Sequence, residues 1–194
     1  RLEENTIVFF TSDNGGPGGY GMREDFFKTN GPLRDYKTSM YEGGLRVPMI
    51  VRWPGKIKAG ATNDLVWYFA DVMPTMAELA GTRPPKGIDG ISVLPTLLGE
   101  DVGRKQQTHE FLYWELITGK RLQQAVRMGD WKAVRQKQGA PLELYNLRDD
   151  LGETKNVAAE HPDVVAKIEA YLKTCRTEPP PQIEPDKPEG QRWR

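Results

Sequence analysis

An apolar run followed at once by polar and glycine residues constrains the fold of this chain more than any other segment. Ile7, Val8, Phe9 and Phe10 form the run, and a glycine-rich stretch over residues 15–21 comes after Asp13 and Asn14. A strand that is apolar on both faces is typical of the centre of a parallel sheet covered by helices. In such open α/β sheets, ligands bind beyond the carboxyl ends of the strands. The segment therefore predicts a strand that delivers polar side chains to a binding site.

Asp13 and Asn14 are the candidate metal ligands at the end of this strand. Adjacent side chains on a straight strand point to opposite faces, so both could hold one ion only where the backbone turns, which Gly15 and Gly16 permit. A carboxylate beside a carboxamide oxygen favours Ca²⁺ or Mg²⁺ over zinc or copper. The same residue types also shape ordinary strand-to-loop turns, so a purely structural role stays open.

Composition excludes several classes of partner. The 194 residues carry 27 basic and 27 acidic side chains and are 38% hydrophobic. A neutral chain has no long-range field to steer nucleic acid or an anionic membrane towards it. No apolar stretch approaches the roughly 20 residues of a membrane-spanning helix, and we find no signal peptide at the start. The single cysteine, Cys175, excludes an internal disulfide and a cysteine-rich zinc site.

The first hundred residues predict only two buried strands, over residues 7–10 and 48–52. Two strands with long connections do not make a stable sheet, so we expect them to belong to a larger sheet whose other strands lie outside this chain. Helices are predicted over 72–80, with Asp71 as the N-cap, and over 92–98. The polar stretch 100–108 predicts a domain boundary.

The second part shows the period of strands. We predict strands over 111–116, 124–128, 131–135 and 142–147, the middle two joined by a hairpin at Gly129-Asp130, and one covering helix that begins at His161-Pro162. The expected fold class is therefore α/β. Residues 1–108 form part of a mostly parallel sheet flanked by helices, residues 109–177 form a small α+β domain with an antiparallel sheet and one packed helix, and residues 178–194 form a proline-rich tail.

A second group of charged residues lies just before the second predicted strand. It consists of Lys37, Glu42 and Arg46, set among glycines between Gly31 and Pro48. An ammonium group is a compact point charge suited to a tetrahedral oxyanion, although Lys37 could also be a solvated loop lysine. For Glu42 and Arg46 we favour a salt bridge that fixes the intervening glycine turn, since ion pairs more often hold structure than perform chemistry.

Taken together, these segments resemble the carboxyl-terminal half of a type I sulfatase, a member of the alkaline-phosphatase-like superfamily. The segments that carry the resemblance are Thr11–Gly15, Lys37 with Glu42–Pro48, Asp71–Thr75, Leu112–Glu115, Arg127–Lys132 and Glu143–Leu147. The resemblance covers roughly residues 5 to 175. Their occurrence together and in order is far more specific than any one short motif.

The resemblance implies a sulfuric ester hydrolase in which Asp13 and Asn14 ligate Ca²⁺ and Lys37 contacts the sulfate group. It also implies a formylglycine nucleophile, which the family carries in a Cys/Ser-x-Pro-x-Arg sequence that is absent from this chain. We therefore expect the chain to be inactive without a missing amino-terminal half. The implied substrate is a sulfated small molecule or carbohydrate, and the implied location is periplasmic or secreted.

His109, Trp114 and Glu115 are candidate substrate-pocket residues, because the second domain should approach the mouth of the site near them. For the aromatic side chains, packing in the core of the strand is the favoured alternative.

Three other functions remain open. A phosphodiesterase or phosphonate hydrolase of the same superfamily shares the fold. A dinucleotide-binding oxidoreductase is suggested by Gly16-x-Gly18-x-x-Gly21 with Asp35, although the preceding Asp13-Asn14 pair would place negative charge beside a pyrophosphate. A non-catalytic interaction module would use the proline-rich tail and Trp193 as its contact element.

Overall fold

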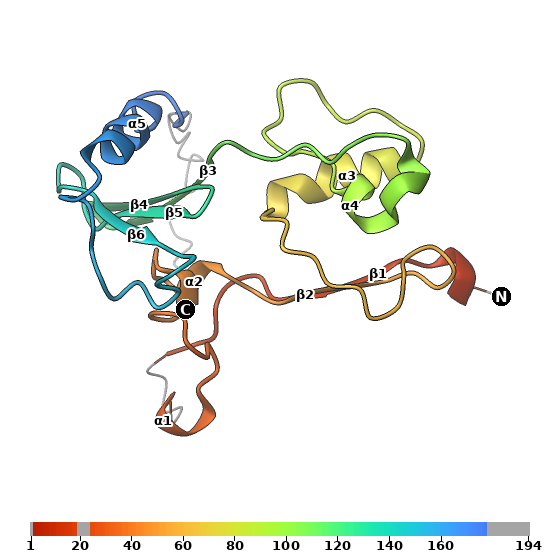
Figure 1. Ribbon diagram of the computed structural model, residues 1–194, viewed down its shortest axis with the longest axis horizontal. Helices are drawn as coiled ribbons and strands as arrows, with labels where there is room; N and C mark the ends of the chain where they lie inside the picture. The colour runs from red at the N-terminus through yellow and green to blue at the C-terminus, as the bar shows by residue number, and fades with distance from the viewer. Residues whose placement is uncertain (1, 19–23, 178–194) are drawn as a thin grey trace, which may run out of the picture.

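The fold consists of two antiparallel sheets joined by a helical segment, as described by a computed structural model over residues 2–18 and 24–177 (Figure 1). The strands are β1 (Val8–Thr11), β2 (Met49–Arg52), β3 (Leu112–Thr118), β4 (Arg121–Met128), β5 (Trp131–Arg135) and β6 (Glu143–Asn146). The α-helices are α1 (Glu24–Phe27), α2 (Glu42–Leu45), α3 (Val72–Leu79), α4 (Leu94–Leu98) and α5 (Pro162–Leu172). Short 3₁₀ turns cover Glu3–Asn5, Phe69–Asp71 and Gly99–Val102.

The larger sheet has the order β3–β4–β5–β6 and lies between α5 on one face and the α2 segment on the other (Figure 1). Successive residues of a strand point to opposite faces, so Ala125 of β4 faces α2 while Val126 faces α5. Both faces are covered, which explains why these strands carry apolar side chains without a clean polar alternation. The α2 face buries Met40, Tyr41, Ala125, Val134 and Tyr145, and the α5 face buries Val126, Ala133, Leu142, Leu144 and Ile168.

The hairpin and the covering helix predicted for this sheet are both confirmed. Gly129 adopts a positive φ of 58° in the turn between β4 and β5, a conformation that glycine enters without a steric penalty. The helix α5 begins at Pro162, whose ring fits the first turn, and its fully buried Ile168 packs on the sheet. The small antiparallel α+β unit expected from the sequence is therefore present.

The pairing of the first two strands differs from the expected parallel arrangement. Within the described residues β1 pairs with β2 in antiparallel register, with Phe10 opposite Ile50. Phe10 is 62% exposed and Ile50 is 60% exposed, so the apolar residues predicted to be buried on both faces are covered on one face only. The apolar run alone does not distinguish a parallel partner from an antiparallel one, and here the chain returns beside itself through the loop that carries α1 and α2.

Asp71 comes directly before α3, as predicted, but its carboxylate does not cap that helix. Its two oxygens accept hydrogen bonds from Tyr68 N at 3.0 Å and from Ile91 N at 2.7 Å. The Asp71 side chain therefore joins the loop before α4 to the 3₁₀ turn before α3. The helix predicted over 92–98 is shorter than expected and begins at Leu94.

Two expectations fall outside the described residues: the proline-rich tail over 178–194, and the part of the glycine fingerprint that includes Gly21. No helix among residues 2–18 and 24–177 is both long enough and apolar enough to cross a bilayer.

Candidate anion and metal site

The two groups of residues predicted from the sequence meet through their backbones. Lys37 N donates a hydrogen bond to Gly16 O at 2.9 Å, and Gly15 N donates to Gly44 O at 3.0 Å. The turn after Asp13 and Asn14 therefore lies directly against the loop that carries Lys37. This contact between segments more than twenty residues apart in sequence is the main geometric feature of the site.

Glycine is required at this contact because the two backbones touch. A Cβ atom on Gly15 would lie 1.7 Å from Gly43 O, and one on Gly43 would lie 2.1 Å from Asp35 O. Neither carbonyl could retreat without breaking the hydrogen bonds that close the loop. The glycines of the Asp-Asn-Gly-Gly and Glu-Gly-Gly motifs thus serve a single close approach.

Asn30 holds the same contact from the side and was not singled out in the sequence. Its Oδ1 accepts a hydrogen bond from Gly16 N at 2.9 Å. Its Nδ2 donates to Asp35 O at 2.7 Å and to Gly43 O at 3.0 Å. One amide side chain therefore joins three backbone segments around the site, a role that no local pattern reveals.

The candidate metal ligands have free oxygen atoms. Asn14 is half-buried and donates through Nδ2 to Gly15 O at 2.9 Å, which leaves Oδ1 without a hydrogen-bond donor in the part of the chain that the structure describes. The Asp13 side chain is exposed and makes no hydrogen bond to another described residue. An oxygen-only pair of this kind fits a hard divalent cation. Over residues 2–18 and 24–177, no group of three His, Cys, Asp or Glu side chains could hold a metal ion.

A hollow of about 400 Å³ lies beside this turn. Asn14, Asn30 and Arg46 contribute polar side chains to it, whereas Asp13 and Lys37 do not line it. Lys37 is exposed. The remaining lining residues are Ser12, Gly15, Gly16, Thr29, Leu33, Val47 and Pro48.

The salt bridge expected between Glu42 and Arg46 is weak, and Glu42 has a much closer partner. Arg46 Nη1 lies 3.9 Å from Glu42 Oε2, and the Arg46 side chain is 51% exposed. Lys132 Nζ of β5 donates to Glu42 Oε1 at 2.7 Å, with both side chains buried. A second buried carboxylate, Glu153 Oε1, lies 3.7 Å from the same ammonium group. The glycine turn is thus anchored to the larger sheet rather than fixed by a local pair.

Burial raises the pKa of the Glu153 carboxyl above its ordinary value, because removal from water disfavours the charged form; the neighbouring Lys132 opposes this shift. Glu153 Oε2 accepts a hydrogen bond from Glu42 N at 2.6 Å. Glu153 Oε1 has no hydrogen-bond partner among the described residues.

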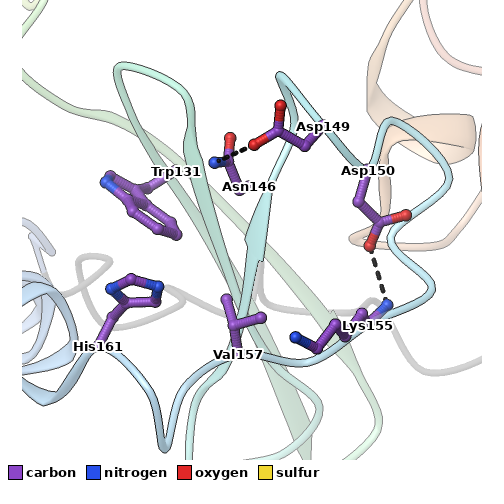
Figure 2. A pocket seen from close by; sticks show the side chains of 7 residues that line it. All are labelled: Trp131, Asn146, Asp149, Asp150, Lys155, Val157 and His161. Atoms are coloured by element: carbon purple, nitrogen blue, oxygen red, sulfur yellow. Dashed lines mark hydrogen bonds between the residues drawn. The ribbon is translucent and has the colours of Figure 1, made fainter.

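A second hollow, of about 220 Å³, opens beside β6 (Figure 2). In Figure 2 the rings of Trp131 and His161 lie next to each other; their centroids are 4.6 Å apart and their planes are tilted by 52°. The polar side chains that line this hollow bond mainly to their own loop. Asn146 Nδ2 donates to Asp149 Oδ2, and Asp150 accepts from Lys155 N, both at 2.9 Å. These bonds serve the loop that follows β6.

The structure places the candidate substrate-pocket residues away from both hollows. His109 Nε2 lies 2.8 Å from Asp71 Oδ1, and only 10% of the His109 side chain is exposed. Trp114 packs against the α2 face of the larger sheet, and Glu115 accepts hydrogen bonds from Tyr113 OH and Arg176 Nε. Packing accounts for these contacts, and a role in substrate binding stays a prediction.

Comparison with known proteins identifies the family. Residues 34–178 match the family described as "N-sulphoglucosamine sulphohydrolase, C-terminal". A sulfatase from Formosa agariphila is 36% identical over 83% of this chain and 30% of its own length. An N-acetylgalactosamine-6-O-sulfatase from Bacteroides thetaiotaomicron is 32% identical over 91% of this chain and 37% of its own length. The chain belongs to the sulfatase family, in its carboxyl-terminal part, and spans about a third of the length of these relatives.

Solved structures agree with the fold. The crystal structure of Ps i-CgsB matches 88% of this chain with a TM-score of 0.73 and 27% identity, over 36% of that protein's chain. The structure of BT4656 in complex with its substrate D-glucosamine-2-N,6-O-disulfate matches 88% of this chain, and 34% of its own, with a TM-score of 0.68 and 27% identity.

Proposed function

We propose that this chain supplies part of the active site of a sulfuric ester hydrolase. Asp13 and Asn14 hold a hard divalent cation, Ca²⁺ by family association, and Lys37 contacts the sulfate group of the substrate. The observation that carries the proposal is the 2.9 Å hydrogen bond from Lys37 N to Gly16 O, which joins the lysine loop to the turn after the two oxygen ligands.

Charge is what such a site contributes to the reaction. Sulfate-ester cleavage develops negative charge on the sulfuryl and leaving-group oxygens, and fixed positive groups stabilise that charge most where water is excluded. A cation bound by Asp13 and Asn14 would polarise a sulfuryl oxygen. Lys37 would orient the sulfate through ammonium hydrogen bonds, which are stronger to an anion than to a neutral acceptor.

We further propose that the nucleophile and the remaining cation ligands come from an amino-terminal part of the same protein. A calcium ion takes about six to eight oxygen ligands, far more than two side chains provide. The exposed apolar face of β1 and β2, with Phe10 62% and Ile50 60% exposed, supports a partner that covers it. The 194-residue chain alone is then inactive, and the complete polypeptide is the active form.

The substrate class we propose is a sulfated carbohydrate, because the relative from Bacteroides thetaiotaomicron is named for a sulfated amino sugar and the BT4656 structure holds another. By the same family association we place the protein in the periplasm or outside the cell.

The test is hydrolysis of a chromogenic aryl sulfate by the complete polypeptide, with and without Ca²⁺. We expect turnover that Lys37→Ala lowers by at least a hundredfold and that the exposed-lysine control Lys58→Ala leaves unchanged. A phenylphosphonate monoester serves as the second substrate. Preference for that ester over the sulfate would assign the protein to the phosphonate hydrolases of the superfamily and overturn the proposal.

A further inference from the structure

We propose that Lys132, on the larger sheet, is a positioning residue for the active-site loop that carries Lys37. The inference rests on the proposed function, because it assigns a role in the same reaction. Lys132 does not line the hollow beside the site. It acts through Glu42, which ends the loop over residues 34–42 that carries Lys37.

Groups from several parts of the chain hold Glu42 at the start of α2. Lys132 Nζ donates to Glu42 Oε1 at 2.7 Å, while Glu153 Oε2 accepts from Glu42 N at 2.6 Å. Arg127 Nη1 lies 3.6 Å from Glu42 Oε2. The backbone and the side chain of one residue at the start of α2 are therefore both held by groups from the larger sheet and the loop after it.

The other end of the loop is held in the same way. Arg34 Nη1 donates to Glu153 O at 2.8 Å and to Tyr145 OH at 3.1 Å. Its guanidinium carbon lies 3.7 Å from the centre of the Tyr41 ring, a cation–π contact. The loop from Arg34 to Glu42 is thus fixed by contacts at both ends, and Lys37 lies between these two fixed ends.

Burial of the charged side chains at Glu42 makes these contacts costly to break. The Lys132 and Glu153 side chains are 0% exposed and that of Glu42 is 5% exposed. Buried charges are tolerated only when they are paired, and a shift of α2 would leave the Lys132 ammonium without its closest partner. Glu153 Oε1 already lacks a hydrogen bond among the described residues, so little compensation is available nearby.

A displacement of Glu42 would also displace the backbone of the candidate site, because the next two residues are hydrogen-bonded to it. Gly43 N donates to Arg34 O at 2.8 Å, and Gly44 O accepts from Gly15 N at 3.0 Å. The glycines leave no spare room, because a Cβ atom on Gly43 would already overlap two carbonyl oxygens. A displaced α2 must therefore move the turn after Asn14 and the backbone of Lys37 together.

The test compares Lys132→Met with Ile168→Ala in the complete polypeptide. Methionine keeps most of the length of the side chain but removes its charge, and Ile168→Ala destabilises the opposite face of the same sheet without touching the loop. Hydrogen exchange of the amides over residues 34–44 is measured together with kcat and KM for an aryl sulfate. If Lys132→Met fails to fold, Glu153→Ala replaces it, because it removes the acceptor of the Glu42 amide.

We expect Lys132→Met to speed exchange over residues 34–44 at least tenfold and to lower kcat/KM at least tenfold, with Ile168→Ala changing neither. Exchange over residues 34–44 that rises no more than in Ile168→Ala would overturn the inference. The exchange result stands even if the wild-type protein hydrolyses no sulfate ester, an outcome that would instead overturn the proposed function.

Discussion

Lys132 Nζ and Glu42 Oε1 are 2.7 Å apart, although 90 residues separate them in the sequence and both side chains are buried. The contact joins the antiparallel sheet to the glycine turn beside the candidate site. The larger sheet is therefore in direct contact with the loop beside the candidate site.

Loss of the buried ammonium group should destabilise the fold strongly. Lys132→Met leaves Glu42 and Glu153 as buried carboxylates without their shared partner, and breaking a buried ion pair costs about 3–5 kcal/mol. Urea denaturation followed by tryptophan fluorescence measures the change. The control is Lys120→Met, an exposed lysine in the turn between β3 and β4, which should shift the midpoint little. Equal midpoints for the two variants would show that the pair contributes nothing.

The stability of the protein should carry a pH dependence that comes from Glu153. Burial raises the pKa of this carboxyl above the ordinary value of 4.5, so the folded state holds the proton more tightly than the unfolded state. The resulting stability is fully present below the ordinary pKa and is lost as the pH rises through the raised folded pKa.

Glu153→Gln removes this titration. The free energy of unfolding of the wild type, relative to that of Glu153→Gln, should therefore fall as the pH is raised from 4.5 towards neutrality. The control variant is Glu160→Gln, which removes an exposed carboxylate and leaves the buried Glu153 in place. A wild-type advantage that grows with pH would mean that the pKa of Glu153 is lowered rather than raised.

The close approach of the two glycine loops should tolerate no side chain. In Gly43→Ala the new Cβ atom would lie 2.1 Å from Asp35 O and 2.2 Å from Arg34 O, so the loop must open. We expect weaker folding and loss of sulfate-ester hydrolysis in the complete polypeptide. Gly152→Ala is the matched control, because its nearest contact, Pro32 O, lies 3.3 Å away. Full activity in Gly43→Ala would show that the lysine loop does not need this geometry.

The 194-residue chain by itself should self-associate through the open face of β1 and β2. Phe10 and Ile50 lie opposite each other there and are both largely exposed, and an exposed apolar patch of this kind favours association with another copy. The double variant Phe10→Ser/Ile50→Thr should shift sedimentation towards the monomer. Ile117→Thr, which alters a 53% exposed residue of the other sheet, should have little effect. A wild-type chain that stays monomeric at high concentration would argue against a covering partner.

Local patterns predicted the elements whose signals are local. The hairpin at Gly129 and the proline-started helix that buries Ile168 follow from turn chemistry and a helical period. Asp71 shows the limit of such reasoning. Its position before α3 suggested a cap, but besides the nearby Tyr68 amide its carboxylate contacts Ile91 and His109, 20 and 38 residues further along the chain.

The contacts that build the candidate site are likewise long-range. No local signal pairs Lys132 with Glu42, or shows that the Asn30 amide joins three loops. The ordered motifs identified the sulfatase family, which the period of apolar residues alone could not do. The antiparallel pairing of β1 with β2 was missed because an apolar run specifies burial, not the direction of the partner strand.

A crystal structure of the complete polypeptide grown with Ca²⁺ and inorganic sulfate would test the proposed cation and sulfate site. We expect one cation with Asp13 and Asn14 oxygens at about 2.3–2.6 Å, the usual range for calcium. We also expect the Lys37 ammonium group within hydrogen-bonding distance of an oxygen of the bound sulfate, on the side of the sulfate that faces away from the cation. A structure in which the cation binds elsewhere, or in which Lys37 points into solvent away from the sulfate, would contradict the proposed site.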